Sequence, residues 1–143
     1  MDHEQIVLRL IGLFEANEVE AFRANTDEPA MQIYPDALGE QGDKSAVMTI
    51  APVYSNEEYI NFELSTEVAT VAGSELKTDI YSLLNSINIK TSCGAYLLLP
   101  EENVIIHRHM LCAPINDYEN MVALAVNNVL TAIDSDISML SDL

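Results

Sequence analysis

The sequence has few positively charged residues, and this scarcity narrows the classes of partner. Only 6 Lys and Arg stand against 23 Asp and Glu, which gives the 143-residue chain a net charge of −17. A protein this acidic is repelled by the phosphates of nucleic acids and by anionic lipids. We therefore expect neither nucleic-acid binding nor adsorption to a membrane.

Long apolar runs and closely spaced cysteines are also absent. No segment approaches 18 consecutive apolar residues, and the run Ile6–Phe14 is short and contains Arg9, so it fits neither a membrane span nor a signal core. The first residues carry acids where a secretory signal carries Lys or Arg. Cys93 and Cys112 form no CxxC pattern and are typical of free thiols in a reducing compartment. We predict a cytoplasmic protein.

Motifs for cofactors and catalysis are missing as well. Glycine occurs five times, and Gly39-Glu40-Gln41-Gly42 matches neither common phosphate-binding loop. The acid pairs Asp27-Glu28, Glu57-Glu58 and Glu101-Glu102 lie in expected turns, where adjacent carboxylates are usually solvated, and no calcium-loop pattern surrounds them. The sequence therefore predicts no catalytic residue, no cofactor and no enzymatic activity.

The residues that are present describe one ordinary domain over 1–143. Hydrophobic residues make up 49% and charged residues 20% of the chain, so it is not a disordered acidic tail. A domain of this length buries about 68–70% of its unfolded surface, enough for a core without disulfides.

Hydrophobic periodicity predicts three helices and five strands. Apolar spacing indicates helices over Asp2–Asn17, from Gly73 with Ser74 as N-cap to Ile87, and from the Asn116-x-x-Glu119 capping pattern to Ile137. Strands are expected over Met31–Tyr34, Ala46–Tyr54, Tyr59–Val68, Ala95–Leu99 and Val104–Cys112, with Glu18–Pro29 ambiguous, Pro35–Asp43 a turn, and Pro52 at an edge or a bulge.

Alternation of Ile60, Phe62 and Leu64 with polar residues indicates a sheet with one buried and one wet face, as antiparallel sheets have. The expected class is therefore α+β: a two-layer fold with an antiparallel sheet of about five strands and helices packed on it. The expected order is α-β-β-β-α-β-β-α.

The last helix is apolar over a wider part of its circumference than packing on one sheet face requires. Either the core surrounds it, or it contacts another chain. No Lys or Arg follows Arg108, whereas acids continue along an expected outer edge that includes Asp134 and Asp136. Such a surface favours a basic, amphipathic segment of a protein partner. The width of the apolar stripe fits a contact with a second chain, and we expect a homodimer. The candidate partner or dimer surface is Tyr118, Val122, Leu124, Val126, Val129 and Leu130.

One pair of side chains could carry chemistry. His107 and His109 are two residues apart in an expected strand, so both lie on one face, about 7 Å apart. Two imidazoles can supply half of a zinc or iron site, but the sequence places no third ligand beside them. A partly exposed polar sheet face is the ordinary interpretation. Cysteine–histidine catalysis would need Cys93 or Cys112 as nucleophile, and Cys112 lies opposite the histidines.

The order of elements resembles a known family. A helix over Ser74–Ile87, a small-residue turn at Cys93-Gly94, the hairpin Ala95–Cys112 and a long final helix over Asn116–Ile137 are similar to the bacterial YbjN-like domain. That family is described as sensory-transduction regulators and shares the fold of type III secretion chaperones. The resemblance covers about residues 2–137 and implies a small acidic protein, often dimeric, with no catalytic residues to carry over.

The favoured hypothesis is a non-enzymatic protein-binding module: a small, acidic, dimeric regulator or chaperone-like protein that captures a partner polypeptide on its sheet or its last helix. Two alternatives remain open. One is a small-molecule or metal-dependent activity centred on His107 and His109, and the other is an acidic mimic of nucleic acid.

Overall fold

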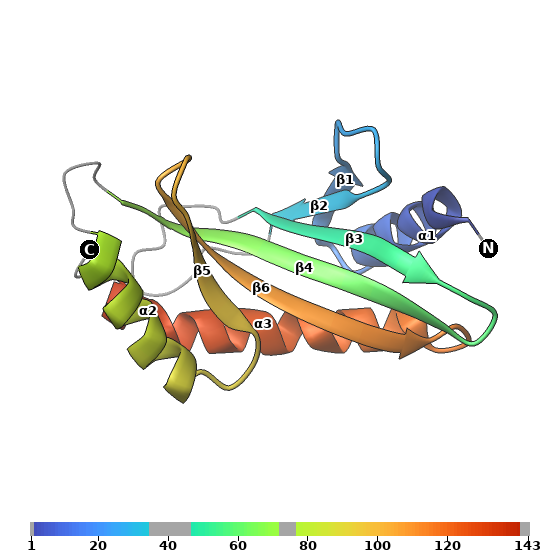
Figure 1. The fold of residues 1–143 in the computed structure, drawn as a ribbon. Coiled ribbons are helices and arrows are strands. Elements are labelled where there is room, and N and C mark those ends of the chain that lie inside the picture. Colours follow the sequence, from blue (N-terminus) through green and yellow to red (C-terminus); the bar gives the residue numbers. More distant parts are fainter. Residues whose placement is uncertain (1, 35–46, 72–76, 141–143) are drawn as a thin grey trace.

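The computed structural model describes residues 2–34, 47–71 and 77–140 (Figure 1). Within them, a helix comes first, four strands follow, and a second helix, a β-hairpin and a long helix complete the fold. The elements are α1 (His3–Ala16), β1 (Glu20–Arg23), β2 (Met31–Tyr34), β3 (Met48–Ser55), β4 (Tyr59–Thr70), α2 (Lys77–Lys90), β5 (Ala95–Leu99), β6 (Val104–Pro114) and α3 (Tyr118–Leu140).

The strands form one antiparallel sheet in the order β1-β2-β3-β4-β6-β5. The α+β class is confirmed. The sixth strand is β1, which arises in the stretch 18–29 that the sequence left ambiguous. Four residues with a single buried side chain, Ala21, carry too little alternation for sequence recognition, and the strand depends on its hairpin with β2.

Local sequence explains the first helix. Asp2 precedes α1 and accepts a hydrogen bond from Gln5 N at 2.8 Å, which satisfies one of the free N–H groups at the helix start. Ile6, Val7 and Leu10 then form a fully buried stripe. The predicted helix is confirmed, with ends within one residue of those expected.

The central strands also follow their sequence pattern. In β4, Ile60, Phe62 and Leu64 are fully buried and alternate with partly exposed polar residues, as predicted. Pro52 lies where β3 extends beyond its register with β2, at an irregularity in its pairing with β4, so the predicted bulge or edge position is confirmed.

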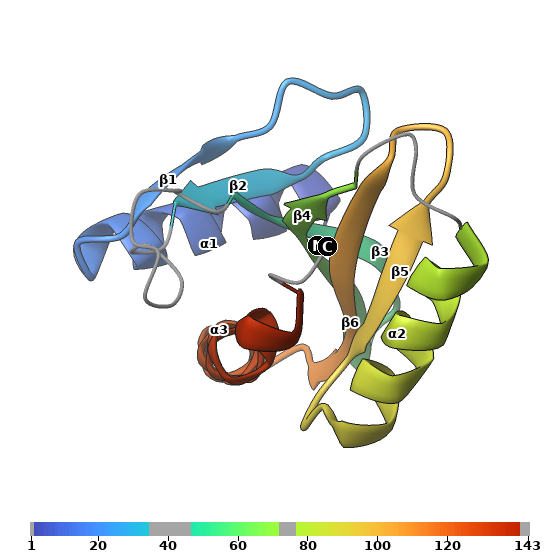
Figure 2. The ribbon, with the colours of Figure 1, turned by 90° about the vertical axis from the view of Figure 1, so that its left-hand side faces the viewer.

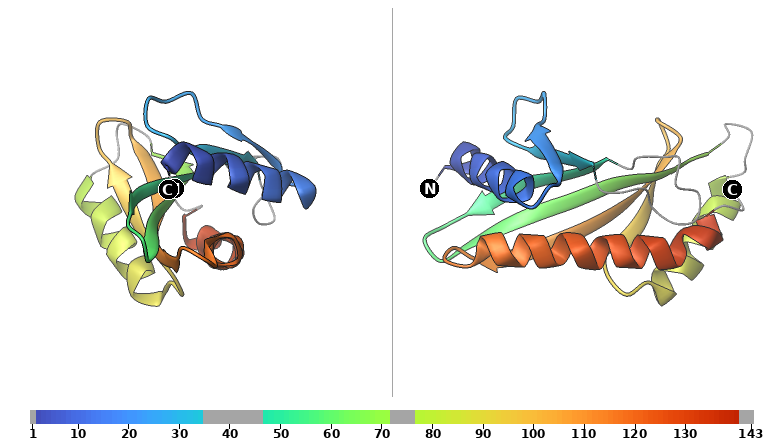
Figure 3. Two further views of the ribbon diagram at one scale, coloured as in Figure 1. Left: turned by 90° about the vertical axis from the view of Figure 1, so that its right-hand side faces the viewer. Right: turned by 180° about the vertical axis from the view of Figure 1, so that it is seen from behind.

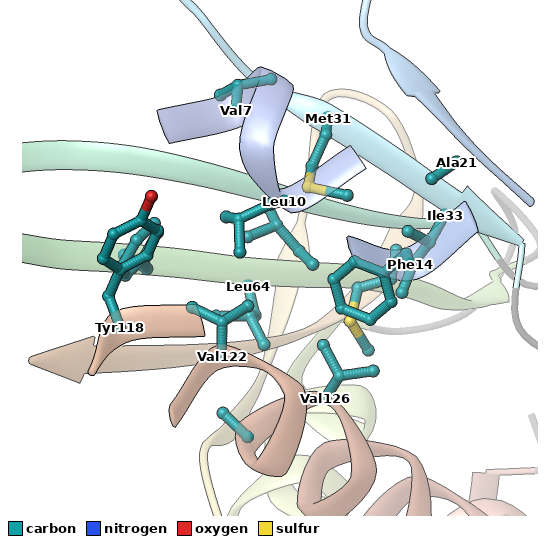
Figure 4. Packing of buried hydrophobic residues seen from close by; sticks show 14 of the residues in the cluster. Val7, Leu10, Phe14, Ala21, Met31, Ile33, Leu64, Tyr118, Val122 and Val126 are labelled. Carbon is teal, nitrogen blue, oxygen red and sulfur yellow. The ribbon is translucent and has the colours of Figure 1, made fainter. Parts of the chain in front are cut away.

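All three helices cover the same face of the sheet. Buried residues of α1 and α3 form one core with the inward side chains of β2, β3 and β4, and Figure 4 shows Leu10 and Phe14 of α1 facing Val122 and Val126 of α3. Figure 2 shows α1 and α3 together on one side, with α2 next to β5. The wide apolar stripe of α3 is therefore shared between the sheet and α1.

A second, smaller core lies at the β5 end of this face. Ile80, Leu84 and Ile87 of α2 pack with Tyr96 of β5 and with a few further residues: Val71, Ile105 and Leu140. Residues 72–76, which include the predicted N-cap Ser74, lie outside the described part of the chain, as does the predicted turn over 35–43.

The start of α3 differs by two residues from the sequence prediction. The helix begins at Tyr118, and the carbonyl of Asp117, not of Asn116, accepts the hydrogen bond from Met121 N at 3.2 Å. The predicted Asn116 capping box is wrong because the chain first turns at 115–117, where Asp117 N donates to Pro114 O. Among the described residues, no helix is long and apolar enough to cross a membrane.

Two glycines give opposite predictions for stability. Gly94 has φ +69°, and an added Cβ would lie 2.5 Å from His107 Cε1 and 2.6 Å from Arg108 O. We expect Gly94→Ala to lower the free energy of unfolding by at least ~2 kcal/mol, from left-handed strain and the clash.

Gly12 lies inside α1 with open space around it, so Gly12→Ala should raise the free energy of unfolding by up to about 1 kcal/mol. Urea unfolding measures both, and equal stability of Gly94→Ala and the wild type would contradict this account.

Candidate functional site: the open face of the sheet

The two histidines lie on the same face of β6, as predicted, but this face is the one that the helices cover. His107 is fully buried and His109 is partly buried. The expectation of a partly exposed polar face is therefore wrong for His107. Sequence spacing placed the pair on one face correctly, but it could not tell that the helices pack there.

The hydrogen bonds of His107 fix its chemical state. Its Nε2 lies 2.8 Å from the carbonyl oxygen of Cys93, which can only accept, so Nε2 carries the proton. Nδ1 is then an acceptor and, like Oγ1 of its cross-strand neighbour Thr66, has no partner within the described residues. Burial is the main cause that lowers the pKa of His107, so the ring is held neutral.

A buried carboxylate on α3 joins this region. Asp136 Oδ2 accepts hydrogen bonds from Thr91 Oγ1 at 2.7 Å and from the Tyr96 hydroxyl at 2.9 Å. The ring of Tyr96 meets His107 edge-on, with 5.0 Å between ring centres. Burial, together with the hydrogen bond to Asp136, raises the pKa of Tyr96. These contacts tie the end of α3 to β5 and β6.

The expectation that Asp136 lies on an acidic outer edge is wrong, because the residue is only 8% exposed. The signal that could have found it is its position: Asp136 is three residues after Ile133 and four before Leu140, on the apolar side of α3.

The thiols do not combine with the histidines into a catalytic pair. His107 bonds the backbone carbonyl of Cys93, not its sulfur, and burial raises the pKa of the Cys93 thiol, with a smaller contribution from Asp136. Cys112 is exposed on the opposite face, as expected. In the ranges 2–34, 47–71 and 77–140, no three His, Cys, Asp or Glu side chains are grouped so that they could hold a metal ion.

The predicted partner surface on α3 lies mostly inside the chain. Val122 and Val129 are fully buried, Val126 nearly so, and Tyr118 stacks on Phe62 with ring centres 6.1 Å apart. These four residues belong to the core, so they are not available to a second chain. Of the six, Leu124 is 56% exposed and Leu130 is partly exposed.

The opposite face of the sheet has no helix on it in the described structure. Figure 1 looks onto β3, β4 and β6 from this side, and the view from behind in Figure 3 shows α1 and α3 in front of the strands. We call it the open face. It comprises the outward side chains of the six strands, among them Phe22, Gln32, Thr49, Tyr54, Glu63, Ser65, Glu67, Leu97, Ile106, Arg108, Met110 and Cys112.

Large apolar side chains on the open face are exposed. Met110 is 49% exposed, Tyr54 51%, Leu97 37% and Phe22 36%, and they come from four different strands. Between them, Arg108 Nε pairs with Glu63 Oε1 at 3.1 Å. The sheet is one of the two capture surfaces expected from the sequence, but the order of residues does not choose between its two faces.

Comparison with known proteins gave no match, either to a family model or to a curated protein sequence. The resemblance to the YbjN-like domain therefore stays a prediction that rests on the order and spacing of elements.

The neutral state of His107 predicts a pH dependence of stability. Below about pH 6.5 the unfolded chain gains a proton at this residue that the folded chain excludes, so the free energy of unfolding should fall as the pH falls towards the lowered folded-state pKa. We expect His107→Gln to weaken this dependence in urea titrations between about pH 7.5 and 5.5. His3→Gln, which affects a partly buried contact to Ser55, is the control. Identical slopes for His107→Gln and the wild type would contradict the assignment.

The exposure of α3 sets the test for a homodimer. Val122→Asp and Val129→Asp would each place a charge in the core and should unfold the chain, so neither reports on a dimer. Leu124→Asp changes an exposed residue and should leave the fold intact. If α3 forms the contact, light scattering will show a dimeric wild type and a monomeric Leu124→Asp variant at the same concentration. An unchanged dimer mass in this variant would exclude Leu124 from the contact.

Proposed function

We propose that this protein is a non-enzymatic binding module that holds a basic, amphipathic segment of a partner protein on the open face of its sheet. The regulatory or chaperone-like role that the family resemblance implies belongs to the same proposal. The observation that carries it is the combination of exposed apolar side chains and excess acid on a sheet face that no described helix covers.

The apolar residues supply the contact area. Met110 lies on β6, beyond the residues of that strand that pair with β5, while Phe22 and Leu97 lie on the two outermost strands, β1 and β5. Several exposed apolar side chains on one face of a sheet offer a partner more apolar contact area than one such side chain does. A segment that crosses the strands could contact several of them at once.

Charge supports a basic occupant. Arg108, the one basic side chain assigned to the open face among the described residues, is already paired with Glu63, while Glu20 and Glu67 have no ion-pair partner there. The chain as a whole carries −17. A second copy would bring the same negative charge to the contact, whereas a basic segment is attracted to it.

Two features at the edges of the sheet, on β5 and β3, disfavour the addition of a strand there. At the β5 edge, the side-chain amide of Asn88 takes the place of a neighbouring strand: it accepts from Tyr96 N at 2.7 Å and donates to Tyr96 O at 3.0 Å. Pro52 and its bulge interrupt the part of β3 that extends beyond β2. Both features are common protections of exposed strand edges.

The test uses a synthetic peptide that alternates lysine and valine, with fluorescence anisotropy of the full-length protein as readout. We expect binding that weakens as salt rises, because exposed charge pairs are screened. Met110→Arg removes an apolar contact and adds repulsion, so it should weaken binding by about tenfold or more.

Leu8→Arg is the matched control, since Leu8 is a similarly exposed apolar residue (56%) on α1 and gains the same charge. Equal loss of binding in both variants would mean that only net charge matters, and it would overturn the placement on the open face. No binding to the wild-type protein at low salt would overturn the proposed function.

A further inference from the structure

The open face contains a hollow of about 250 Å³ where β2, β3, β4 and β6 lie side by side near the end of β5. Pockets for cofactors and drug-sized molecules usually measure about 300–1,000 Å³. This hollow is therefore small for such a ligand, but it is of the size that a single inserted side chain fills.

The lining of the hollow combines acceptors with an apolar wall. Four outward polar side chains from three strands line it: Gln32, Thr49, Ser65 and Glu67. A fifth polar residue of the lining, Thr66, points its side chain to the face that the helices cover. None of the four has a side-chain hydrogen bond or ion pair in the part of the chain that the structure describes. The apolar wall is formed by Val47, Leu99 and Ile106.

We infer that this hollow receives an arginine side chain of the partner segment. The inference rests on the proposed function and names the anchor that the open face takes. Insertion of one basic side chain into a pocket of this kind is a common way for an interface to fix its partner.

The guanidinium group suits the hollow better than an ammonium group does. It presents five N–H donors in a fixed plane, whereas lysine presents three on a compact charge. The hollow offers the Glu67 carboxylate, two hydroxyls and one amide oxygen as acceptors. Glu67 can be the counter-charge because the neighbouring acid on the same strand face, Glu63, is already paired with Arg108. The apolar wall would cover the methylene stem of the arginine.

The experiment compares three versions of the lysine–valine peptide, with arginine, citrulline or lysine at one central position, against wild-type protein and Glu67→Gln. We expect the arginine peptide to bind the wild type best. Citrulline in the peptide, or Glu67→Gln in the protein, should each weaken this binding by about tenfold, and the two changes together should cost little more than either alone.

Glu57→Gln is the matched control, since it removes the same charge from an exposed acid in the β3–β4 turn. Equal effects of Glu67→Gln and Glu57→Gln, or independent effects of citrulline and Glu67→Gln, would overturn the arginine site. If Met110→Arg still weakens the lysine peptide in that case, the proposed function stands without the hollow. If none of the three peptides binds the wild type, the proposed function itself fails.

Discussion

The structure depends on the burial of a single face of one antiparallel sheet. Three helices pack on that face, and the inward side chains of the strands form two adjoining cores with them. Burial of a large apolar face is the main favourable contribution to the stability of a domain of this size. Because all the described helices lie on one side, the other face of the sheet is left to solvent or to a partner.

Polar contacts fasten one corner of this arrangement. Asp136 on α3 reaches Thr91 and Tyr96, and His107 reaches the carbonyl of Cys93. Each of these bonds joins segments far apart in the sequence, and each buried polar group would be costly without its partner. Hydrogen bonds as well as apolar packing therefore hold together the corner where α2, α3, β5 and β6 meet. His107 and Cys93 are residue types that can act in catalysis, but here they contribute a hydrogen bond to this corner.

The open face and the edges of the sheet together determine how the sheet can associate with other chains. The unpaired backbone groups at the edge of a sheet can pair with strands of other chains, which leads to aggregation. Here Asn88 occupies the backbone groups of Tyr96 on β5, and Pro52 removes a donor from β3. On the open face, acidic residues separate the exposed apolar ones. The proposed basic, amphipathic partner would meet both charge and apolar area on such a face.

Much of the fold could be predicted from local sequence. Asp2 and the stripe from Ile6 to Phe14 determined α1, and the alternation through Phe62 and Leu64 determined β4, because helix and strand periods are written directly in the order of side chains. The turn positions of the three acid pairs could also be predicted from local sequence. Strand β1 escaped, since four residues give no reliable period.

The location of the candidate site was decided only by tertiary structure. Sequence alone determined that His107 and His109 share a face, that Cys112 lies on the other, and that α3 is more apolar than one sheet contact needs. The sequence did not determine which face the helices cover. For this reason the burial of His107 and Asp136, and of most of the predicted α3 surface, was not predicted. The physical reason is that periodicity records which side chains point together, whereas burial depends on what long-range packing places opposite them.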